Sequence, residues 1–354
     1  METEKAISFI EGSIMAPLLQ DSNITDISYN GDSIFYLHNL MGRKKSEISI
    51  DSNLAKDFIR QIANLTEKQF SYQNPKLDVS VGRYRINAVH PSIARNGNAS
   101  CLNFSIRIAS TTPIITNTSS FLNPSLISLL RVLIRSRVSL LIGGLTGSGK
   151  TEFQKYLISI MEENTRLIVI DNILELALLS YLNNSLDINI WQADERNSEA
   201  SIQELVKNAL RSNPDWLIVA ESRGKEMIEV LNSAMTGHPI ITTLHAFDIN
   251  SMPTRIARMV LMNETKQDFQ ILMQDIFYNF RFYIYLKREI HKDGKVKRFI
   301  SEIAEFDENG QKTVMYEGDD ISHKVYKIPK KILKYLDFKG DKEFFEYFVG
   351  KINE

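Results

Sequence analysis

Short apolar runs alternate with amphipathic stretches through the second half of the chain. Continuous apolar runs of strand length predict buried strands over residues 138–142, 167–170, 216–219 and 240–244. Between these runs, apolar side chains recur at helical spacing over residues 153–161, 202–210 and 227–235. Because strands alternate with helices, we expect an α/β fold with a doubly wound, mostly parallel sheet in this part of the chain.

The amino-terminal part has a different pattern. Residues 24–29 alternate like a strand, end at the turn Asn30-Gly31-Asp32, and are followed by a second apolar run over residues 34–37. This succession predicts a β-hairpin. Further elements are expected as a helix over 54–65 and strands over 84–89 and 102–108.

Composition divides the chain into four expected parts. Residues 110–125 are rich in Ser, Thr, Asn and Pro, which is typical of a linker. The last part mixes Lys with Tyr and Phe, and we expect one or two small helices there. The expected parts are a smaller α/β domain over 1–108, a linker over 109–125, a larger α/β domain over 126–318 and a C-terminal helical tail over 319–354.

Charge and cysteine content narrow the classes of function. The 354 residues include 42 Lys and Arg against 43 Asp and Glu, which argues against a broad electrostatic grip on nucleic acid. Cys101 is the only cysteine, so the sequence has no disulfide framework, and a reducing cytoplasm is the natural compartment. The apolar stretch 126–142 is interrupted by three arginines and the start lacks a signal-peptide pattern. We therefore expect no transmembrane segment, and membrane association only through partners.

The segment Gly144-Leu145-Thr146-Gly147-Ser148-Gly149-Lys150-Thr151 matches the spacing G-x-x-x-x-G-K-[ST] of a phosphate-binding loop. Its glycines let backbone amides curl around the β- and γ-phosphates, Lys150 adds a positive charge, and Thr151 can ligate Mg²⁺. A predicted strand precedes the loop and a predicted helix follows it, as the motif requires. We expect a nucleoside triphosphate to bind here with Mg²⁺; the alternative is a glycine-rich turn that binds nothing. The predicted phosphate-binding residues are Gly144, Thr146, Gly147, Ser148, Gly149, Lys150 and Thr151.

Polar residues follow three of the predicted strands. Asp171, Glu221 and His245 come after them, and Glu175 lies four residues beyond Asp171. In a mostly parallel sheet, ligands bind outside the carboxyl ends of the strands, so these side chains are expected on the edge that carries the phosphate loop. Asp171 is alternatively a surface turn residue, and His238 and His245 are alternatively ordinary turn or core histidines. A buried carboxylate such as Glu221 is costly without a partner, which favours a functional reading.

Taken together, these segments resemble the secretion ATPase superfamily, which drives type II secretion, type IV pili, Tad pili and type IV secretion. The resemblance covers about residues 15–310 and is strongest over 141–260. Four segments carry it in the family's order: residues 142–151 match the Walker A loop, 170–176 occupy the place of the Asp box, 208–224 resemble the Walker B segment with its glutamate, and 236–246 resemble the His box.

Two departures from the family pattern concern catalysis. The family usually reads Glu-Asp where this chain has Asp171-Asn172, and its Walker B glycine is replaced by Ala220. Asp171 and Glu175 still supply carboxylates, so the resemblance implies that activity survives, and slow turnover is compatible with these changes.

The amino-terminal half resembles the shorter Tad and type IV secretion branch, at residues 24–27, 30–31 and 82–89. The resemblance implies a PAS-like domain there, ahead of a RecA-like P-loop ATPase domain. In such proteins arginines of the amino-terminal domain reach the nucleotide. By position Arg85 and Arg107 are the candidates, followed by Arg83; the alternative is that they are surface arginines on strands.

The resemblance also implies a mechanism. Glu221 is expected to orient the water shell of Mg²⁺ or to polarise the attacking water, with Glu175 and Asp171 as other candidates, and His245 to contact the γ-phosphate. The protein would be a cytoplasmic homohexameric motor, peripheral at the membrane through an inner-membrane platform or coupling protein, with no sequence-specific nucleic-acid binding. The alternatives are a catalytically weak regulatory or scaffolding subunit, and a nucleic-acid motor or small-molecule kinase sharing only the loop.

Overall fold

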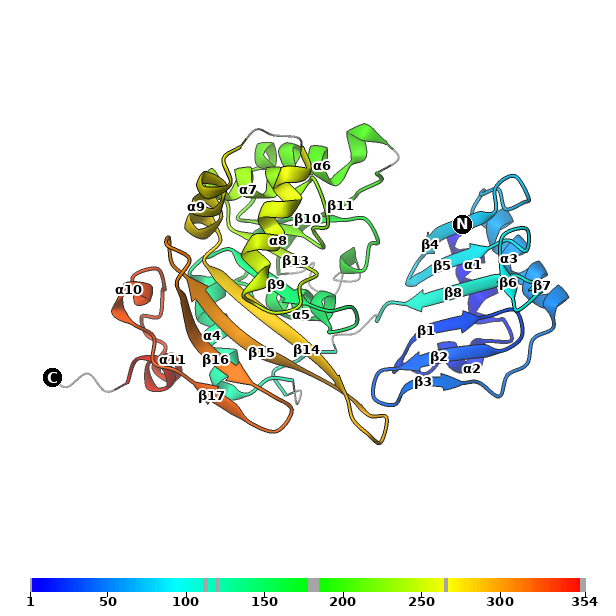
Figure 1. Cartoon of the computed structure of the whole chain (residues 1–354), viewed down its shortest axis with the longest axis horizontal. Coiled ribbons are helices and arrows are strands. Elements are labelled where there is room, and N and C mark those ends of the chain that lie inside the picture. The colour runs from blue at the N-terminus through cyan, green and yellow to red at the C-terminus, as the bar shows by residue number, and fades with distance from the viewer. Residues whose placement is uncertain are drawn as a thin grey trace. The chain divides into compact units, whose positions relative to one another are not determined.

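The computed structural model describes residues 2–110, 114–118, 121–177, 185–195, 197–263 and 267–350. The chain forms two compact units. Unit 1 comprises Met1–Thr112 with Ile290–Lys297, and unit 2 comprises Pro113–Glu289 with Arg298–Glu354. Both are mixed α/β structures (Figure 1). Part of the predicted linker over 109–125 lies outside the described residues.

Unit 1 is built on a six-stranded sheet in the order β3-β2-β1-β8-β5-β4, whose paired neighbours run antiparallel. The predicted hairpin over 24–37 is confirmed, since β1 pairs with β2 and Tyr29 lies opposite Ile34. The strands are β1 (Ile24–Tyr29), β2 (Ile34–His38), β3 (Gly42–Lys45), β4 (Lys76–Val81), β5 (Tyr84–Val89) and β8 (Asn103–Ile108), with a separate short pair β6 (Arg95–Asn96) and β7 (Ala99–Ser100).

Three helices accompany this sheet in the described part of unit 1: α1 (Glu2–Glu11), α2 (Ala16–Leu19) and α3 (Ser52–Leu65). The helix predicted over 54–65 begins two residues earlier than expected, because the Asp51 carboxylate accepts hydrogen bonds from the amides of Asn53 and Leu54 and caps the first turn. Phe58 on α3 packs against Phe104 of β8, with ring centroids 5.7 Å apart. The amphipathic helix therefore shares one core with the sheet.

Unit 2 contains a nine-stranded sheet in the order β11-β10-β12-β13-β9-β14-β15-β16-β17 (Figure 1). From β11 to β14 every neighbouring pair is parallel. The strands are β9 (Leu140–Gly144), β10 (Arg166–Asp171), β11 (Asp187–Gln192), β12 (Trp216–Val219), β13 (Ile240–Leu244), β14 (Phe282–Ile290), β15 (Val296–Phe306), β16 (Lys312–Gly318) and β17 (His323–Val325). The four predicted strands of this region are all present.

The helices of unit 2 are α4 (Pro124–Arg135), α5 (Lys150–Ser159), α6 (Ile202–Ala209), α7 (Met227–Met235), α8 (Ser251–Val260), α9 (Phe269–Asn279), α10 (Lys330–Leu333) and α11 (Lys342–Phe344). The 3-10 helices η2 (Ser198–Ala200), η3 (Leu210–Ser212) and η4 (Leu261–Asn263) and the π-helix η5 (Phe345–Val349) are also present. The three predicted helices correspond to α5, α6 and α7.

Two apolar cores lie on the two faces of the sheet, as strand alternation requires. On β9, Leu140 and Ile142 belong to the core that contains α4 and α5, whereas Leu141 belongs to the core that contains α6, α7, α8 and α9. Strands buried on both faces read as continuous apolar runs, which is why the sequence pattern located them.

The segment over 319–354 is more than a helical tail. β17 extends the sheet by pairing with β16, and α10, α11 and η5 follow it. Phe344 and Phe348 are fully buried in the same core as α4, and the Asp341 carboxylate caps α11 through the amide of Phe344. The strand was not expected from sequence, because it is only three residues long.

Candidate nucleotide-binding site

The predicted phosphate loop connects β9 to α5, with Gly144 as the last strand residue and Lys150 as the first helical residue. Gly147 and Gly149 have φ angles of 76° and 95°, a region that glycine adopts without steric cost. Gly149 caps α5 without any side-chain hydrogen bond. The backbone N–H groups of the first helical turn are therefore available to an anion, and the helix dipole favours one.

The inside of the loop is closely packed around Gly144 and Ser148. A Cβ atom at Gly144 would lie 2.5 Å from Ser148 Oγ and 2.6 Å from the carbonyl oxygen of Leu286. The Ser148 side chain is buried, and its hydroxyl has no hydrogen-bond partner among the described residues. Thr151 is half-buried and Thr146 is exposed. Position 144 has no room for any side chain, and the buried Ser148 hydroxyl has no partner in the described parts of the chain. Both features fit a loop that closes around a phosphate.

Lys150 is buried beneath this loop. Its ammonium donates to the carbonyl oxygens of Gly144 (2.9 Å) and Leu145 (3.2 Å), and its Nζ lies 3.3 Å from His245 Nδ1. Burial lowers the pKa of Lys150 to about 8; the carboxylate of Glu221 counteracts this effect and the charge of Arg223 adds to it. Lys150 is thus largely protonated at pH 7 and titrates within a range that experiments can reach.

Glu221, just beyond the end of β12, contacts two neighbouring groups. Its Oε1 lies 3.0 Å from His245 Nε2, and its Oε2 accepts a hydrogen bond from the Arg223 guanidinium. Burial raises the pKa of the Glu221 carboxyl, but the hydrogen bond and charge of Arg223, together with His245 and Lys150, outweigh it and lower the pKa below its usual range. Glu221 is therefore ionised at neutral pH.

His245, which follows β13, bridges Lys150 and Glu221. Because a lysine ammonium can only donate, its contact with Nδ1 requires that nitrogen to be unprotonated. The neutral ring then carries its proton on Nε2, which lies 3.0 Å from Glu221 Oε1, an oxygen that has no hydrogen-bond partner within the described ranges of the chain. Burial and the charge of Lys150 lower the pKa of His245, although Glu221 acts in the opposite direction. The structure thus brings the predicted residues Lys150, Glu221 and His245 together at the carboxyl edge of the parallel strands.

Asp171 has a defined structural role at the end of β10. Its side chain is buried, and its two carboxylate oxygens accept hydrogen bonds from the amides of Ile173 and Leu176, both at 2.9 Å. These bonds shape the turn that carries Glu175. Glu175 is half-buried, and its charge contributes to raising the pKa of Arg223. Glu175 is therefore close enough to act electrostatically on Arg223.

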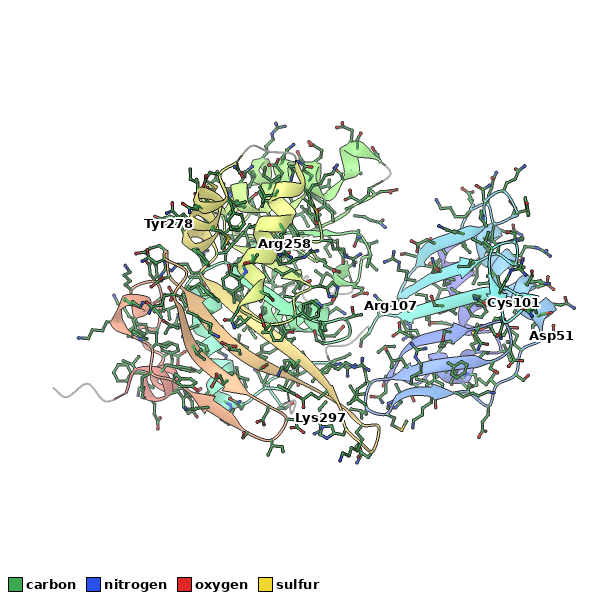
Figure 2. The ribbon with its side chains drawn as sticks, in the orientation of Figure 1. Asp51, Cys101, Arg107, Arg258, Tyr278 and Lys297 are labelled. Carbon is green, nitrogen blue, oxygen red and sulfur yellow. The ribbon has the colours of Figure 1, made fainter. Side chains whose placement is uncertain are left out.

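The three arginines predicted from the amino-terminal half belong to unit 1, where Arg85 is on β5, Arg107 is on β8 and Arg83 is in the turn between β4 and β5. Arg85 forms a bidentate pair with Asp78, at 3.2 and 3.1 Å, and Arg107 on β8 (Figure 2) lies 3.5 Å from Asp26. Arg83 donates to the Tyr84 hydroxyl and to the carbonyl oxygen of Leu19. Their role toward a nucleotide stays a prediction.

Three arginines near the loop were missed by sequence reasoning. Arg223 lies two residues after Glu221, and that spacing within an extended segment was the available signal. Arg298 donates from Nε to the carbonyl oxygen of Gly147 at 2.8 Å, and Arg288 lies beside the same glycine. No local pattern marked Arg288 or Arg298, because β14 and β15 reach the loop only through the order of strands in the sheet.

The family model described as type II/IV secretion system protein matches residues 83–277, more than half of the chain. A protein of Bacillus anthracis described as uncharacterized is 30% identical over 325 residues, covering 87% of this chain and 71% of that protein. The type IV secretion system protein VirB11 of Brucella suis is 30% identical over 180 residues, covering 50% of this chain and 49% of VirB11.

Among solved structures, the X-ray structure of the Legionella pneumophila ATPase DotB is similar with a TM-score of 0.64 and 22% identity, covering 83% of this chain and 80% of that one. This similarity supports a RecA-like α/β fold. Within the described part of the chain, no helix has both the length and the apolar character needed to cross a bilayer.

Proposed function

Because the chain belongs to the type II/IV secretion system protein family, within the secretion ATPase superfamily, we propose that it hydrolyses ATP to power a type IV secretion, conjugation or pilus machine. The observation that carries this proposal is the Lys150–His245–Glu221 cluster at the phosphate loop, whose atoms lie 3.3 and 3.0 Å apart. A cation, a neutral imidazole and an ionised carboxylate at a phosphate loop suit phosphoryl transfer, in which catalysis is positioning and charge stabilisation.

Each residue has a role in this proposal. The amides of residues 147–150 and the Lys150 ammonium hold the β- and γ-phosphates, and the hydroxyl of Thr151 holds Mg²⁺. When bound, Mg²⁺ neutralises charge on the phosphate oxygens. His245, already in contact with Lys150 and Glu221, reports the γ-phosphate to both groups.

Glu221 is the proposed catalytic carboxylate. Its low pKa keeps it charged, so it can accept hydrogen bonds from the attacking water or from the water shell of the metal. Asp171 is less suited, because each of its carboxylate oxygens already accepts a backbone amide. We assign Asp171 to shaping the turn after β10, and Glu175 to supporting the charge of Arg223.

The proposal also covers the assembly, the membrane partner and the role of unit 1. We propose a homohexamer that works at the cytoplasmic face of the membrane through a platform or coupling protein, with unit 1 as a PAS-like domain. The linker over 109–125 is proposed as the hinge, and Arg85 and Arg107 as arginines that reach the nucleotide. The similarity to VirB11, whose name places that protein in a type IV secretion system, favours this machine over the Tad branch.

The test is ATP hydrolysis by the purified protein beside Lys150→Ala and Glu221→Gln, with the mass in solution measured with and without ATP and Mg²⁺. We expect turnover that both variants lose, in a particle of six subunits. A wild-type protein that binds ATP but turns over no faster than Lys150→Ala would overturn the motor.

A second candidate is a nucleotide-binding regulatory or scaffolding subunit with weak hydrolysis. It is favoured by Asn172 and Ala220, which depart from the family pattern near Asp171 and Glu221. Tight ATP binding without turnover, with ATP-dependent assembly preserved in Glu221→Gln, would select this candidate.

A further inference from the structure

Two arginines from neighbouring strands lie beside the phosphate loop, and the proposed catalytic cluster does not use them. Arg288 is on β14 and Arg298 on β15. A Cβ atom placed on Gly147 would lie 3.7 Å from Cδ and from Nη1 of Arg288, and one placed on Gly149 would lie 3.7 Å from Cδ of Arg298. Arg298 Nε also donates to the carbonyl oxygen of Gly147 at 2.8 Å. Both side chains therefore border the glycines whose backbone forms the loop.

The order of strands in the sheet places Arg288 and Arg298 on the same face and edge as the phosphate loop. β14 runs parallel to β9, with Leu286 opposite Gly144, so Arg288 lies two residues beyond the point where β9 ends. Leu286 and Ile300 belong to the core shared with α5. Because residues two apart on a strand point to the same face, Arg288 and Arg298 share the face of α5 and lie at the carboxyl edge where ligands bind.

The positive charges of Arg288 and Arg298 make this edge of the loop suited to an anion. The Arg288 Nε is buried and has no hydrogen-bond acceptor in the part of the chain that the structure describes. Burial lowers the pKa of Arg298, and the charge of Arg288 lowers it further. Two guanidinium groups side by side at a loop built of backbone amides would both be stabilised by a polyanion bound at that loop.

We infer that Arg288 and Arg298 form a two-arginine clamp that binds the phosphate chain of the nucleotide held by residues 144–151. This inference rests on the proposed function, because it needs a nucleotide at the loop. It differs from the expected role of Arg85 and Arg107, since both clamp arginines come from unit 2, the unit that carries the loop. The clamp supplies affinity for phosphate from the same unit, before any arginine of unit 1 takes part.

The same two strands provide matched controls. Lys287 and Lys297 are the neighbours of the two arginines, and both are exposed; Lys297 on β15 is labelled in Figure 2. Strand alternation directs neighbouring side chains to opposite faces of the sheet. Lys287→Gln with Lys297→Gln therefore removes the same charge as Arg288→Gln with Arg298→Gln, but away from the loop.

The experiment measures equilibrium affinity for a fluorescent ATP analogue in the full chain, and its displacement by ATP and by inorganic tripolyphosphate, at several salt concentrations. A charge-assisted contact is worth about tenfold in affinity, so we expect each arginine variant to lose about tenfold for both competitors. The double variant should also show a weaker salt dependence, and Lys at both positions should restore part of the affinity. Thermal unfolding without nucleotide reports whether each variant folds.

Three outcomes would overturn either the two-arginine clamp or the proposed function. An arginine double variant that binds both competitors within twofold of the lysine control, while wild type binds ATP, overturns the clamp and leaves the proposed function standing. Lost affinity with unchanged salt dependence and no rescue by lysine also overturns the clamp, because it indicates a displaced loop. A wild-type protein that binds neither ATP nor tripolyphosphate overturns the proposed function itself.

Discussion

The arginines of unit 1 and the arginines beside the phosphate loop of unit 2 differ in their surroundings. Arg85 forms a bidentate pair with Asp78, and Arg107 lies near Asp26. Arg298 instead donates to the carbonyl oxygen of Gly147, and the like charge of Arg288 lowers its pKa. An arginine held by a carboxylate must leave it before binding phosphate, whereas an arginine beside another cation gains stability as soon as an anion arrives. The arginines of unit 1 therefore suit a contact with the nucleotide that is regulated by movement. The arginines beside the phosphate loop suit constitutive binding of the nucleotide.

Glu221 and Asp171 form a parallel contrast among the carboxylates, and it yields the largest expected effect. Glu221→Gln should lower kcat about a hundredfold or more while ATP still binds, because general acid–base groups contribute factors of that order. Asp171→Asn should reduce kcat much less, since the carboxylate orders a turn. Steady-state hydrolysis beside ATP binding by both variants checks this. Equal losses of kcat in the two variants would remove the distinction.

The arginine contrast predicts a split between affinity and turnover. Arg288→Gln with Arg298→Gln should weaken ATP binding, whereas Arg85→Gln with Arg107→Gln should lower kcat about tenfold or more with ATP affinity unchanged, because such arginines act on charge that develops in the transition state. Binding and hydrolysis measured on both double variants decide it. If the unit 1 double variant loses ATP affinity and keeps kcat, Arg85 and Arg107 bind the phosphate chain, which is the role proposed for Arg288 and Arg298.

A smaller effect concerns pH, through Lys150. Its pKa is lowered by burial to about 8, and a bound phosphate raises that pKa by favouring the charged form. Above pH 8 the free protein has lost part of the lysine charge and must take up a proton on binding, so ATP affinity should fall as pH rises from 8 to 9.5. Below about pH 7, one unit under that pKa, the lysine is almost fully charged and affinity should be flat.

Calorimetry in buffers of different ionisation enthalpy measures this proton uptake directly. Lys150→Arg is the matched control, because arginine stays charged throughout this range. A decline of the same size in Lys150→Arg would assign the pH dependence to another group.

The smallest effect is on stability. The Arg85–Asp78 pair is about one-third exposed on the arginine side and half exposed on the other, so solvent screens it. Arg85→Gln should lower the free energy of unfolding by no more than about 1 kcal/mol, the usual range for a surface pair. Urea unfolding of wild type and Arg85→Gln measures it, and a larger loss would mean that Arg85 is structurally required and therefore poorly placed to move.

The sequence by itself determined the local elements and the phosphate loop. The parallel strands are buried on both faces and read as continuous apolar runs, and the loop's chemistry depends on glycines and a lysine at fixed spacing. It also predicted that Glu221 and His245 would lie at the edge of the sheet where Lys150 begins α5, since both follow parallel strands.

Only the tertiary structure decided which charges meet there. The sequence predicted Asp171 as a candidate catalytic group. Only the folded turn shows that its carboxylate accepts hydrogen bonds from two backbone amides. Arg288 and Arg298 gave no signal, because their distance from Gly147 and Gly149 depends on β14 and β15 lying next to β9 in the sheet. Spacing along the chain fixes local geometry, but contacts between distant strands follow from strand order, which no short motif encodes.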